Sequence, residues 1–165
     1  MGTRGVFGAI FVNVDYLEGN PPAILLLQRN GNPDGSGYPD QWELSGGRVQ
    51  EGESDEDCLK RVVYQKTGIQ VESLGNSLLD LGVAPGVVTA QSDTSCVYLC
   101  QKKGGSLKDF PTQSHKAAYW ATVGNLFDGE IKVGCPNPTS KGYVSRMMEM
   151  ILAAFRAHKA QMEQR

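Results

Sequence analysis

One segment, residues 41–69, constrains the fold of this chain more than any other. It contains Ser45-Gly46-Gly47, where two glycines permit backbone conformations that a side chain would forbid. Ser54, followed three residues later by Asp57, forms a capping-box pattern. Apolar residues then recur at helical spacing until the run ends at Gly68; they are Cys58, Leu59, Val62 and Val63. The segment therefore predicts a glycine-rich loop that is followed by a helix of about four turns.

Strand-like segments lie on both sides of this helix. Two early runs, 6–16 and 23–29, are rich in β-branched and aliphatic residues, and a turn signal separates them. Further strands are expected at 41–44, 77–83, 87–90, 95–102 and 117–123. The pattern predicts a mixed sheet. Near the end, an apolar stripe with helical spacing predicts an amphipathic helix; its residues are Val144, Met147, Met148, Ile151, Leu152 and Phe155.

Size and composition favour one globular domain that spans residues 1–165. The chain has 165 residues, of which 40% are hydrophobic, and its formal net charge is -2. Because no global positive field exists to attract polyanions, we expect neither nucleic acid nor a membrane as a partner. The longest early apolar stretch, 6–12, is too short to span a bilayer, and we expect a cytoplasmic protein.

The four cysteines do not suggest a zinc site, because none of them forms a CxxC pair. Cys96 and Cys100 alternate with Tyr98 inside an apolar run, a pattern typical of half-buried thiols in a strand of a reduced cytosolic protein.

The spacing Gly47-x5-Glu53-x7-Arg61, closed by Gly68-Ile69, resembles the Nudix box. The flanking residues 38–49 and 119–127 are also similar to the strand that enters the box and to the late strand and short helix of that family. The resemblance implies an α/β Nudix fold. Its elements are an α/β/α sandwich with a mixed central sheet, the box loop and helix, and a C-terminal helix. It also implies hydrolysis of nucleoside diphosphate derivatives with Mg or Mn held by glutamates of the box helix.

The second half of the box departs from the family pattern. Where the family has Arg-Glu-U-x-Glu-Glu-x-Gly-U, this chain has Val62, Gln65 and Lys66 in place of the three glutamates. The three positions share one helix face, and Mg prefers hard anionic oxygen ligands. A dication about 4 Å from Lys66 would face about 8 kcal/mol of repulsion at an effective dielectric near 20. We therefore expect no metal cofactor here, and Mg or Mn only if a rearranged site exists.

Other residues offer weak replacements for the missing glutamates. Asp55, Glu56 and Asp57 lie in the first turn, where the helix dipole favours acids, and Asp55 is about 10 Å along the axis from Val62. His115 lies ahead of the late strand, where the family often has a metal-binding glutamate. It is a base or a ligand, or simply a solvated loop histidine, and the last alternative is the one we expect.

The box keeps its scaffold residues. In the family, the counterparts of the catalytic-box residues Glu53 and Arg61 fix the loop to the helix, so their retention implies a structural role here. Gly46 and Gly47 allow main-chain groups to approach a ligand, or else the loop needs glycine for conformational reasons alone. Lys66, Arg61 and Arg48 would supply positive charge to a phosphorylated ligand.

Two aromatic residues ahead of the box leave two readings open. Trp42 and Tyr38 would stack on a base, or else they serve core packing and the rim of a loop, respectively.

Three functions remain open at this point. The favoured one is a Nudix-family protein with lost or strongly reduced hydrolysis that still binds a nucleotide or another phosphorylated small molecule. The second is an active Mg- or Mn-dependent hydrolase with a rearranged metal site. The third is a non-enzymatic module that binds a protein through its groove or its Met-rich terminal helix. The sequence does not identify the ligand or the oligomeric state.

Overall fold

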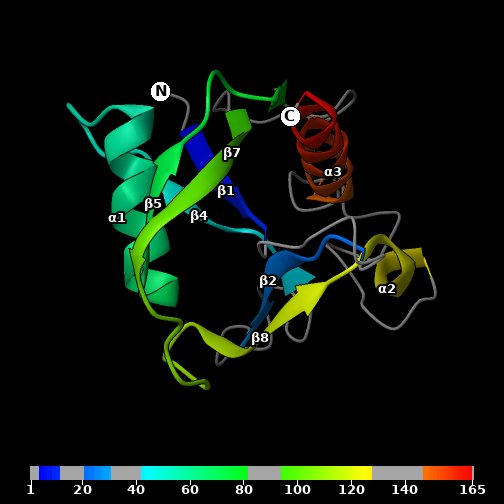
Figure 1. Cartoon of the computed structure of the whole chain (residues 1–165). Helices are drawn as coiled ribbons and strands as arrows, with labels where there is room; N and C mark the ends of the chain where they lie inside the picture. The colour runs from blue at the N-terminus through cyan, green and yellow to red at the C-terminus, as the bar shows by residue number, and fades with distance from the viewer. Residues whose placement is uncertain (1–3, 12–20, 31–41, 82–93, 128–146, 165) are drawn as a thin grey trace, which may run out of the picture.

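The computed structural model describes residues 4–11, 21–30, 42–81, 94–127 and 147–164, which form two sheets and three helices (Figure 1). The larger sheet contains β1 (Arg4–Ile10), β4 (Ser45–Arg48), β5 (Ile69–Ser73), β6 (Leu79–Leu81) and β7 (Thr94–Gly105). The smaller sheet contains β2 (Ile24–Arg29), β3 (Trp42–Glu43) and β8 (His115–Ala121). The helices are α1 (Asp55–Thr67), α2 (Val123–Phe127) and α3 (Met147–Glu163).

The larger sheet has the order β4-β1-β7-β5, and β6 pairs with β7 beside β5. β1 and β7 run parallel, while the other strand pairs of this sheet are antiparallel. The smaller sheet has the order β3-β2-β8 and is antiparallel. The prediction of a mixed sheet is therefore confirmed, and β4 lies at one edge of the larger sheet.

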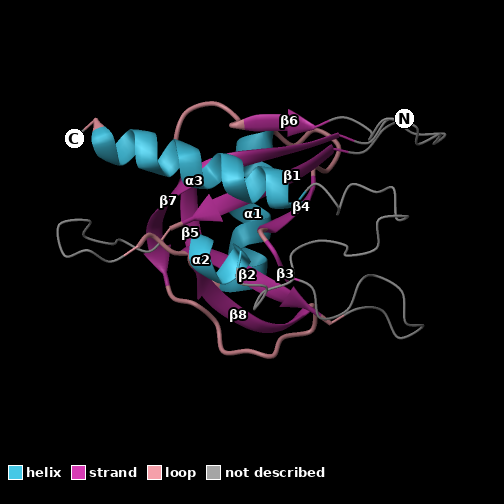
Figure 2. Cartoon of the chain, turned by 90° about the vertical axis from the view of Figure 1, so that its right-hand side faces the viewer, coloured by secondary structure: helices cyan, strands magenta, loops and turns pink. Residues whose placement is uncertain are grey.

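Helices cover both faces of the larger sheet, α1 on one side and α3 on the other (Figures 1 and 2). Side chains of β1 alternate between the two layers, as the period of a strand requires. Val6 and Ile10 belong to the buried cluster around α1, and Phe7 and Ala9 belong to the cluster around α3. This arrangement confirms the predicted α/β/α sandwich.

Helix α1 begins and ends where the sequence predicts. The Ser54 hydroxyl accepts a hydrogen bond from the Asp57 amide at 3.1 Å, and Gly68 ends the helix with a φ of 82°. A left-handed residue at this position favours glycine, and the Gly68 amide donates to the Tyr64 carbonyl. The four predicted apolar positions are all buried. The C-terminal helix is likewise confirmed, although Val144 lies outside the described residues.

Several predicted boundaries were wrong. Residues 45–48 form strand β4 rather than a loop, because they pair with β1. The sequence reasoning missed β5, whose buried residues Ile69 and Val71 alternate with exposed Gln70 directly after the helix end. Residues 77–83 contain only the short strand β6, and Val123 begins α2 rather than ending β8. The strand predicted at 87–90, Tyr38 and Cys135 lie outside the described residues.

Within the described part of the chain, no helix is long and apolar enough to cross a membrane. Cys58, Cys96 and Cys100 are buried. Cys96 and Cys100 lie on one strand, β7, as predicted, but they are buried rather than half-buried, because both pack in the cluster around α1.

Candidate functional site

A pair of charged residues ties the box loop to α1. The Arg61 guanidinium donates to both carboxylate oxygens of Glu53, at 2.8 and 2.9 Å, and also to the Arg48 carbonyl at 3.0 Å. The Gln50 amide donates to Glu53 at 3.0 Å. The hydrogen bonds from Arg61, and next those from Gln50, lower the pKa of Glu53 from 4.5 to about 2. Glu53 and Arg61 thus occupy the positions of loop anchors.

The acids at the start of α1 have structural partners of their own. Arg4 donates to both oxygens of Asp55 at 2.8 Å, and the Tyr98 hydroxyl donates at 2.8 Å. The Arg4 hydrogen bonds are the main reason why the pKa of Asp55 is lowered. Burial alone would raise the pKa of Glu56, but hydrogen bonds from Ser73 and attraction to Lys60 outweigh it and leave this pKa lowered. Both acids therefore stabilise the start of the helix.

Close packing explains both glycines of the box. A Cβ atom on Gly46 would clash with the Val6 carbonyl oxygen and lie 2.5 Å from a ring carbon of Phe7. A Cβ atom on Gly47 would lie 2.7 Å from a methyl carbon of Val62 on α1. The two residues point to opposite faces of β4, as neighbours on a strand do. The fold therefore needs glycine at both positions regardless of any ligand.

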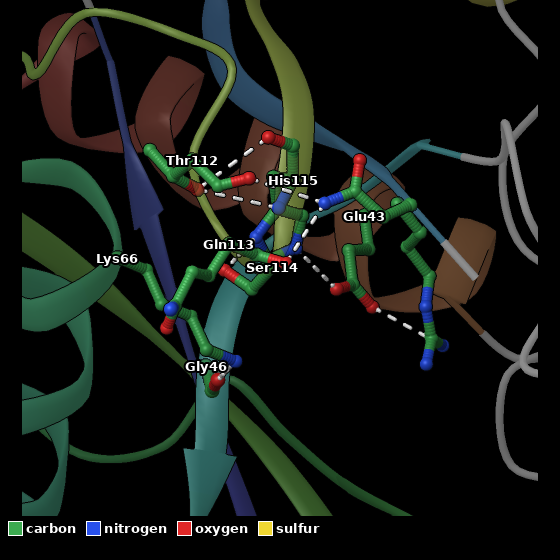
Figure 3. A network of polar contacts seen from close by, with 9 residues as sticks. Glu43, Gly46, Lys66, Thr112, Gln113, Ser114 and His115 are labelled. Atoms are coloured by element: carbon green, nitrogen blue, oxygen red, sulfur yellow. Dashed lines mark hydrogen bonds and ion pairs between the residues drawn. The ribbon is translucent and has the colours of Figure 1, made fainter. Parts of the chain in front are cut away.

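Lys66 reaches back from the last turn of α1 to strand β4 (Figure 3). Its ammonium group donates a hydrogen bond to the Gly46 carbonyl oxygen, which is available because β4 is an edge strand. Burial lowers the pKa of Lys66, while attraction to Glu43 opposes that shift and repulsion from Arg29 adds to it. The sequence prediction placed Lys66 and Gly46 in one site, and the structure brings them into contact.

The other two positions of this helix face do not supply metal ligands either. Val62 is 4% exposed and packs in the cluster around α1, where its methyl groups face Gly47. Gln65 is exposed, and its main-chain carbonyl accepts a hydrogen bond from the Lys108 ammonium group at 2.6 Å. With Lys60, Tyr64 and other residues, Gln65 lines an open hollow of about 560 Å³ on the surface of α1 and β5.

These donors do not fit the Mg or Mn ion that the box resemblance implies. The described residues include no group of three or more histidine, cysteine, aspartate or glutamate side chains arranged to hold a metal. The one side chain that reaches the Gly46 carbonyl carries a positive charge, which repels a dication. A divalent ion at this point of the helix would lack anionic ligands from the face that normally provides them.

His115 is not the solvated loop histidine that the sequence suggested. It begins β8 and is 3% exposed, and its ring nitrogens lie 2.9 Å from Glu43 and 2.7 Å from the Ser114 hydroxyl (Figure 3). Arg29 lies 3.6 Å from the other oxygen of Glu43. The expectation failed because strand pairing of β2 with β8 carries the histidine into the interior, where its ring contacts Glu43 of β3.

Sequence reasoning overlooked Glu43 altogether. The sequence did contain a signal for this residue. Glu43 lies two residues before Ser45, in the short strand that comes after the strand ending at Arg29. Glu43 pairs opposite Leu27 on β2, which brings its carboxylate near Arg29. Its side chain is only 13% exposed, and its charge acts on Lys66. Glu43 therefore belongs to the site as a carboxylate whose charge acts on the lysine.

Two further candidates have a weaker connection to the site. Arg48 is exposed, and the contact it makes to the box is through its main-chain carbonyl rather than through its guanidinium. Trp42 is partly buried against the cluster around α3 and meets Tyr119 edge to face, with ring centroids 6.2 Å apart. These contacts favour core packing for Trp42 over base stacking.

Comparisons with known proteins agree with this architecture. The family model of the NUDIX domain matches residues 4–134. A "Putative 8-oxo-dGTP diphosphatase 2" of Mycobacterium tuberculosis is 29% identical over 107 residues, which cover 64% of this chain and 68% of the relative.

Two solved structures share the fold at lower identity. A UDP-X diphosphatase superimposes with a TM-score of 0.62 at 16% identity, covering 96% of this chain and 64% of that one, so this chain spans under two thirds of its length. The NUDIX domain of Shewanella oneidensis NrtR, solved with ADP ribose, superimposes with a TM-score of 0.58 at 17% identity, covering 96% of this chain and 89% of that one. Given the family match over most of its length, the chain belongs to the NUDIX domain family.

Proposed function

We propose that this chain is a NUDIX-family protein with lost or strongly reduced metal-dependent pyrophosphohydrolase activity that still binds a nucleotide or another phosphorylated small molecule. Residues 1–165 would act as a single domain in the cytoplasm. The observation that carries the proposal is the contact between the Lys66 ammonium group and the Gly46 carbonyl, at a box position where family members place a metal-binding glutamate.

The donors on the helix face support the proposed loss of metal-dependent chemistry. Hydrolysis of a diphosphate by this family depends on a cation that polarises the phosphate and places the attacking water. Here the face offers a buried valine, an exposed glutamine and a lysine. A metal bound only through the phosphates of its substrate would be weakly and variably placed.

The intact scaffold supports the proposal of retained ligand binding. The Glu53–Arg61 anchor, the capped start of α1 and the close approach of Gly47 to Val62 hold the box in its folded geometry. The names of similar proteins supply the ligand class to test, since they concern 8-oxo-dGTP, a UDP derivative and ADP ribose. All three are nucleotides that carry a phosphoric anhydride.

The competing function is a working hydrolase with a rearranged metal site, and Glu43 is the observation that favours it. The charge of Glu43 acts on Lys66, so a rearrangement that moves Lys66 away from the Gly46 carbonyl would leave an acid in the electrostatic environment of the site. In the structure, however, Glu43 contacts His115 and Arg29, which would have to be displaced first.

The test compares the wild-type protein with the double variant Gln65→Glu/Lys66→Glu, both incubated with Mg or Mn. ADP-ribose, 8-oxo-dGTP and a UDP-sugar serve as substrates, and products are separated by ion-pair chromatography. We expect turnover by the double variant to exceed that of the wild type by at least about tenfold, because both changes add carboxylates and one also removes a cation. Metal-dependent turnover by the wild type at the rate of the double variant would refute the proposal.

A further inference from the structure

We infer that the Lys66 ammonium group is a built-in replacement for the metal ion, so that the site binds the metal-free form of a nucleoside diphosphate and divalent cations weaken that binding. The inference rests on the proposed function for its ligand class. Beyond that function, it identifies Lys66 as the cation that meets the ligand and predicts that added Mg weakens, rather than strengthens, ligand binding.

The first support is the position of the charge. Position 66 faces the Gly46 carbonyl, so a glutamate at this position and that carbonyl would offer two oxygen ligands to one cation. In this chain, position 66 brings its own cation to the same carbonyl. An ammonium group has three N–H donors, and the hydrogen bonds among the described residues use one of them. Two donors are left for a ligand.

The second support is that Lys66 has no carboxylate of its own. Its charged neighbours are Arg61, Arg29 and Glu43. Arg61 is paired with Glu53, and Arg29 lies 3.6 Å from Glu43. Among the ion pairs of the described residues, none includes Lys66, so its charge is balanced only by a neutral carbonyl at contact distance. An oxyanion of a phosphate would complete this environment.

The third support is an unpaired hydroxyl on the adjacent residue. Ser45 is 1% exposed, and its Oγ atom is the one buried side-chain oxygen or nitrogen without a hydrogen-bond partner within the described part of the chain. Side chains alternate along β4, so Ser45 points to the same face as Gly47, which meets Val62 of α1. The hydroxyl therefore lies on the α1 side of the strand. Leaving it unpaired carries a cost, and the hydroxyl belongs to the residue next to the carbonyl that Lys66 contacts.

The predicted effect of metal follows from charge balance. A diphosphate that has already bound Mg has lost two units of negative charge, and its metal would approach the ammonium group. The free diphosphate is therefore the better ligand for a site with one fixed cation. A site that used Mg in the family manner would show the opposite response.

The experiment is isothermal titration calorimetry with two probes, ADP and inorganic pyrophosphate, each measured in EDTA and again with Mg in excess. We expect both probes to bind the wild type in EDTA, and excess Mg to weaken the affinity at least about threefold. Lys66→Met should weaken binding in EDTA about tenfold or more, the usual loss when a hydrogen bond to a charged partner is removed. Lys66→Arg should retain part of the affinity because it keeps the charge.

One control variant and one further test variant make the result specific. Lys60→Met removes a lysine from the same helix whose side chain is about half exposed and lies 3.6 Å from Glu56, and it should leave the affinity unchanged. Ser45→Ala should weaken binding two- to threefold. Circular dichroism verifies that each variant folds, and the comparison of EDTA with Mg uses the wild type alone and needs no variant.

Three results would overturn the inference. They are stronger binding with Mg than with EDTA, unchanged affinity in folded Lys66→Met, and no binding of either probe in EDTA. None of them is the outcome that refutes the proposed function, since that outcome is metal-dependent turnover by the wild type. A protein that lacks turnover and whose affinity does not depend on Lys66 would keep the proposed function and lose only the built-in cation.

Discussion

The two halves of the box, residues 53–61 and 62–66, differ in the contacts that hold them in place. The first half, from Glu53 to Arg61, is held by hydrogen-bonded ion pairs, such as Glu53–Arg61 and Arg4–Asp55. The second half, from Val62 to Lys66, carries a buried apolar side chain and an ammonium group on a carbonyl. The first half has the residues expected of the family scaffold, and the second lacks the residues expected of its metal chemistry.

The difference indicates that the scaffold and the metal ligands of this helix are physically separable. Contacts of the first half place the loop and the helix start, and none of them requires a bound ion. The carboxylates expected in the second half repel one another unless a cation is present. Replacing them with Val62 and Lys66 removes that repulsion, and Val62 also adds apolar burial against Gly47. Each half can therefore be tested by itself.

The largest effect is expected from Gly46→Ala, which tests the scaffold at the strand beneath the helix. The new methyl group would overlap the Val6 carbonyl and the Phe7 ring, and the backbone of β1 would have to move. We expect the free energy of unfolding to fall by about 3 kcal/mol, at the upper end of overpacking effects. Chemical denaturation measures the change.

Gly124→Ala is the matched control for this substitution. Gly124 lies in α2, where the nearest atom to an added Cβ is 3.6 Å away, so the methyl group meets only ordinary contacts. We expect stability to stay the same or to rise slightly, because alanine favours a helix over glycine. Equal losses in both variants would show that the tight packing at Gly46 is not what makes glycine necessary there.

The next effect comes from restoring the missing carboxylates one at a time. Val62→Glu places a charge inside an apolar cluster and should cost about 2–3 kcal/mol in the absence of metal. Gln65→Glu is exposed and should cost almost nothing. The triple variant Val62→Glu/Gln65→Glu/Lys66→Glu should bind Mg more tightly than the wild type, as measured by calorimetry, provided that circular dichroism shows it folded.

The response of the triple variant to Mg sharpens the comparison of the two halves. If the first half holds the family geometry, added Mg should recover stability that Val62→Glu removed, because the ion binds only the folded state. If the triple variant folds but its melting temperature does not change when Mg is added, then the position of the loop differs from that of the family, in addition to the missing metal ligands.

Sequence alone was sufficient for the scaffold. The cap at Ser54, the buried positions of α1 and the end at Gly68 depend on neighbours within a few residues, so local spacing predicts them. The apolar stripe of α3 is likewise a local periodicity. The sequence analysis did not predict strand β5, because its five residues contain only two buried apolar ones. The pairing with β7 that stabilises the strand is not visible in the segment itself.

The polar part of the site could be predicted only in part. Lys66 was identified from its box position, but its contact with Gly46 depends on how α1 packs against β4, 20 residues away in sequence. The Glu43–His115 contact joins residues 72 apart, and it turns a histidine expected in solvent into a buried one. Contacts of this kind depend on strand pairing between distant segments, which hydrophobic periodicity does not specify.

A smaller effect is expected from Ser54→Ala, which removes the cap of the first half. The alanine cannot accept the hydrogen bond from the Asp57 amide, so the start of α1 loses one partner. We expect the free energy of unfolding to fall by about 1 kcal/mol. Ser54→Asp preserves an acceptor and should stay within a few tenths of the wild type. A loss of equal size in both variants would mean that the hydroxyl has another role.

The smallest effect is a difference in acid sensitivity between wild type and Glu53→Gln. The hydrogen bonds of Arg61 and Gln50 lower the pKa of Glu53 from 4.5 to about 2 in the folded protein. A lowered folded-state pKa means that the charged carboxylate stabilises the fold above pH 4.5 and that this contribution disappears as the pH falls toward 2. The melting temperature of the wild type should therefore exceed that of Glu53→Gln at pH 6, and the gap should narrow between pH 4.5 and pH 3. Glu72→Gln is the control, because Glu72 pairs with Lys103 while both side chains are about half exposed, and its gap should be near zero throughout. A gap for Glu53→Gln that stays constant across this range would mean that the amide loses packing or geometry rather than charge, and the Glu53–Arg61 anchor would then stabilise the loop without depending on ionisation.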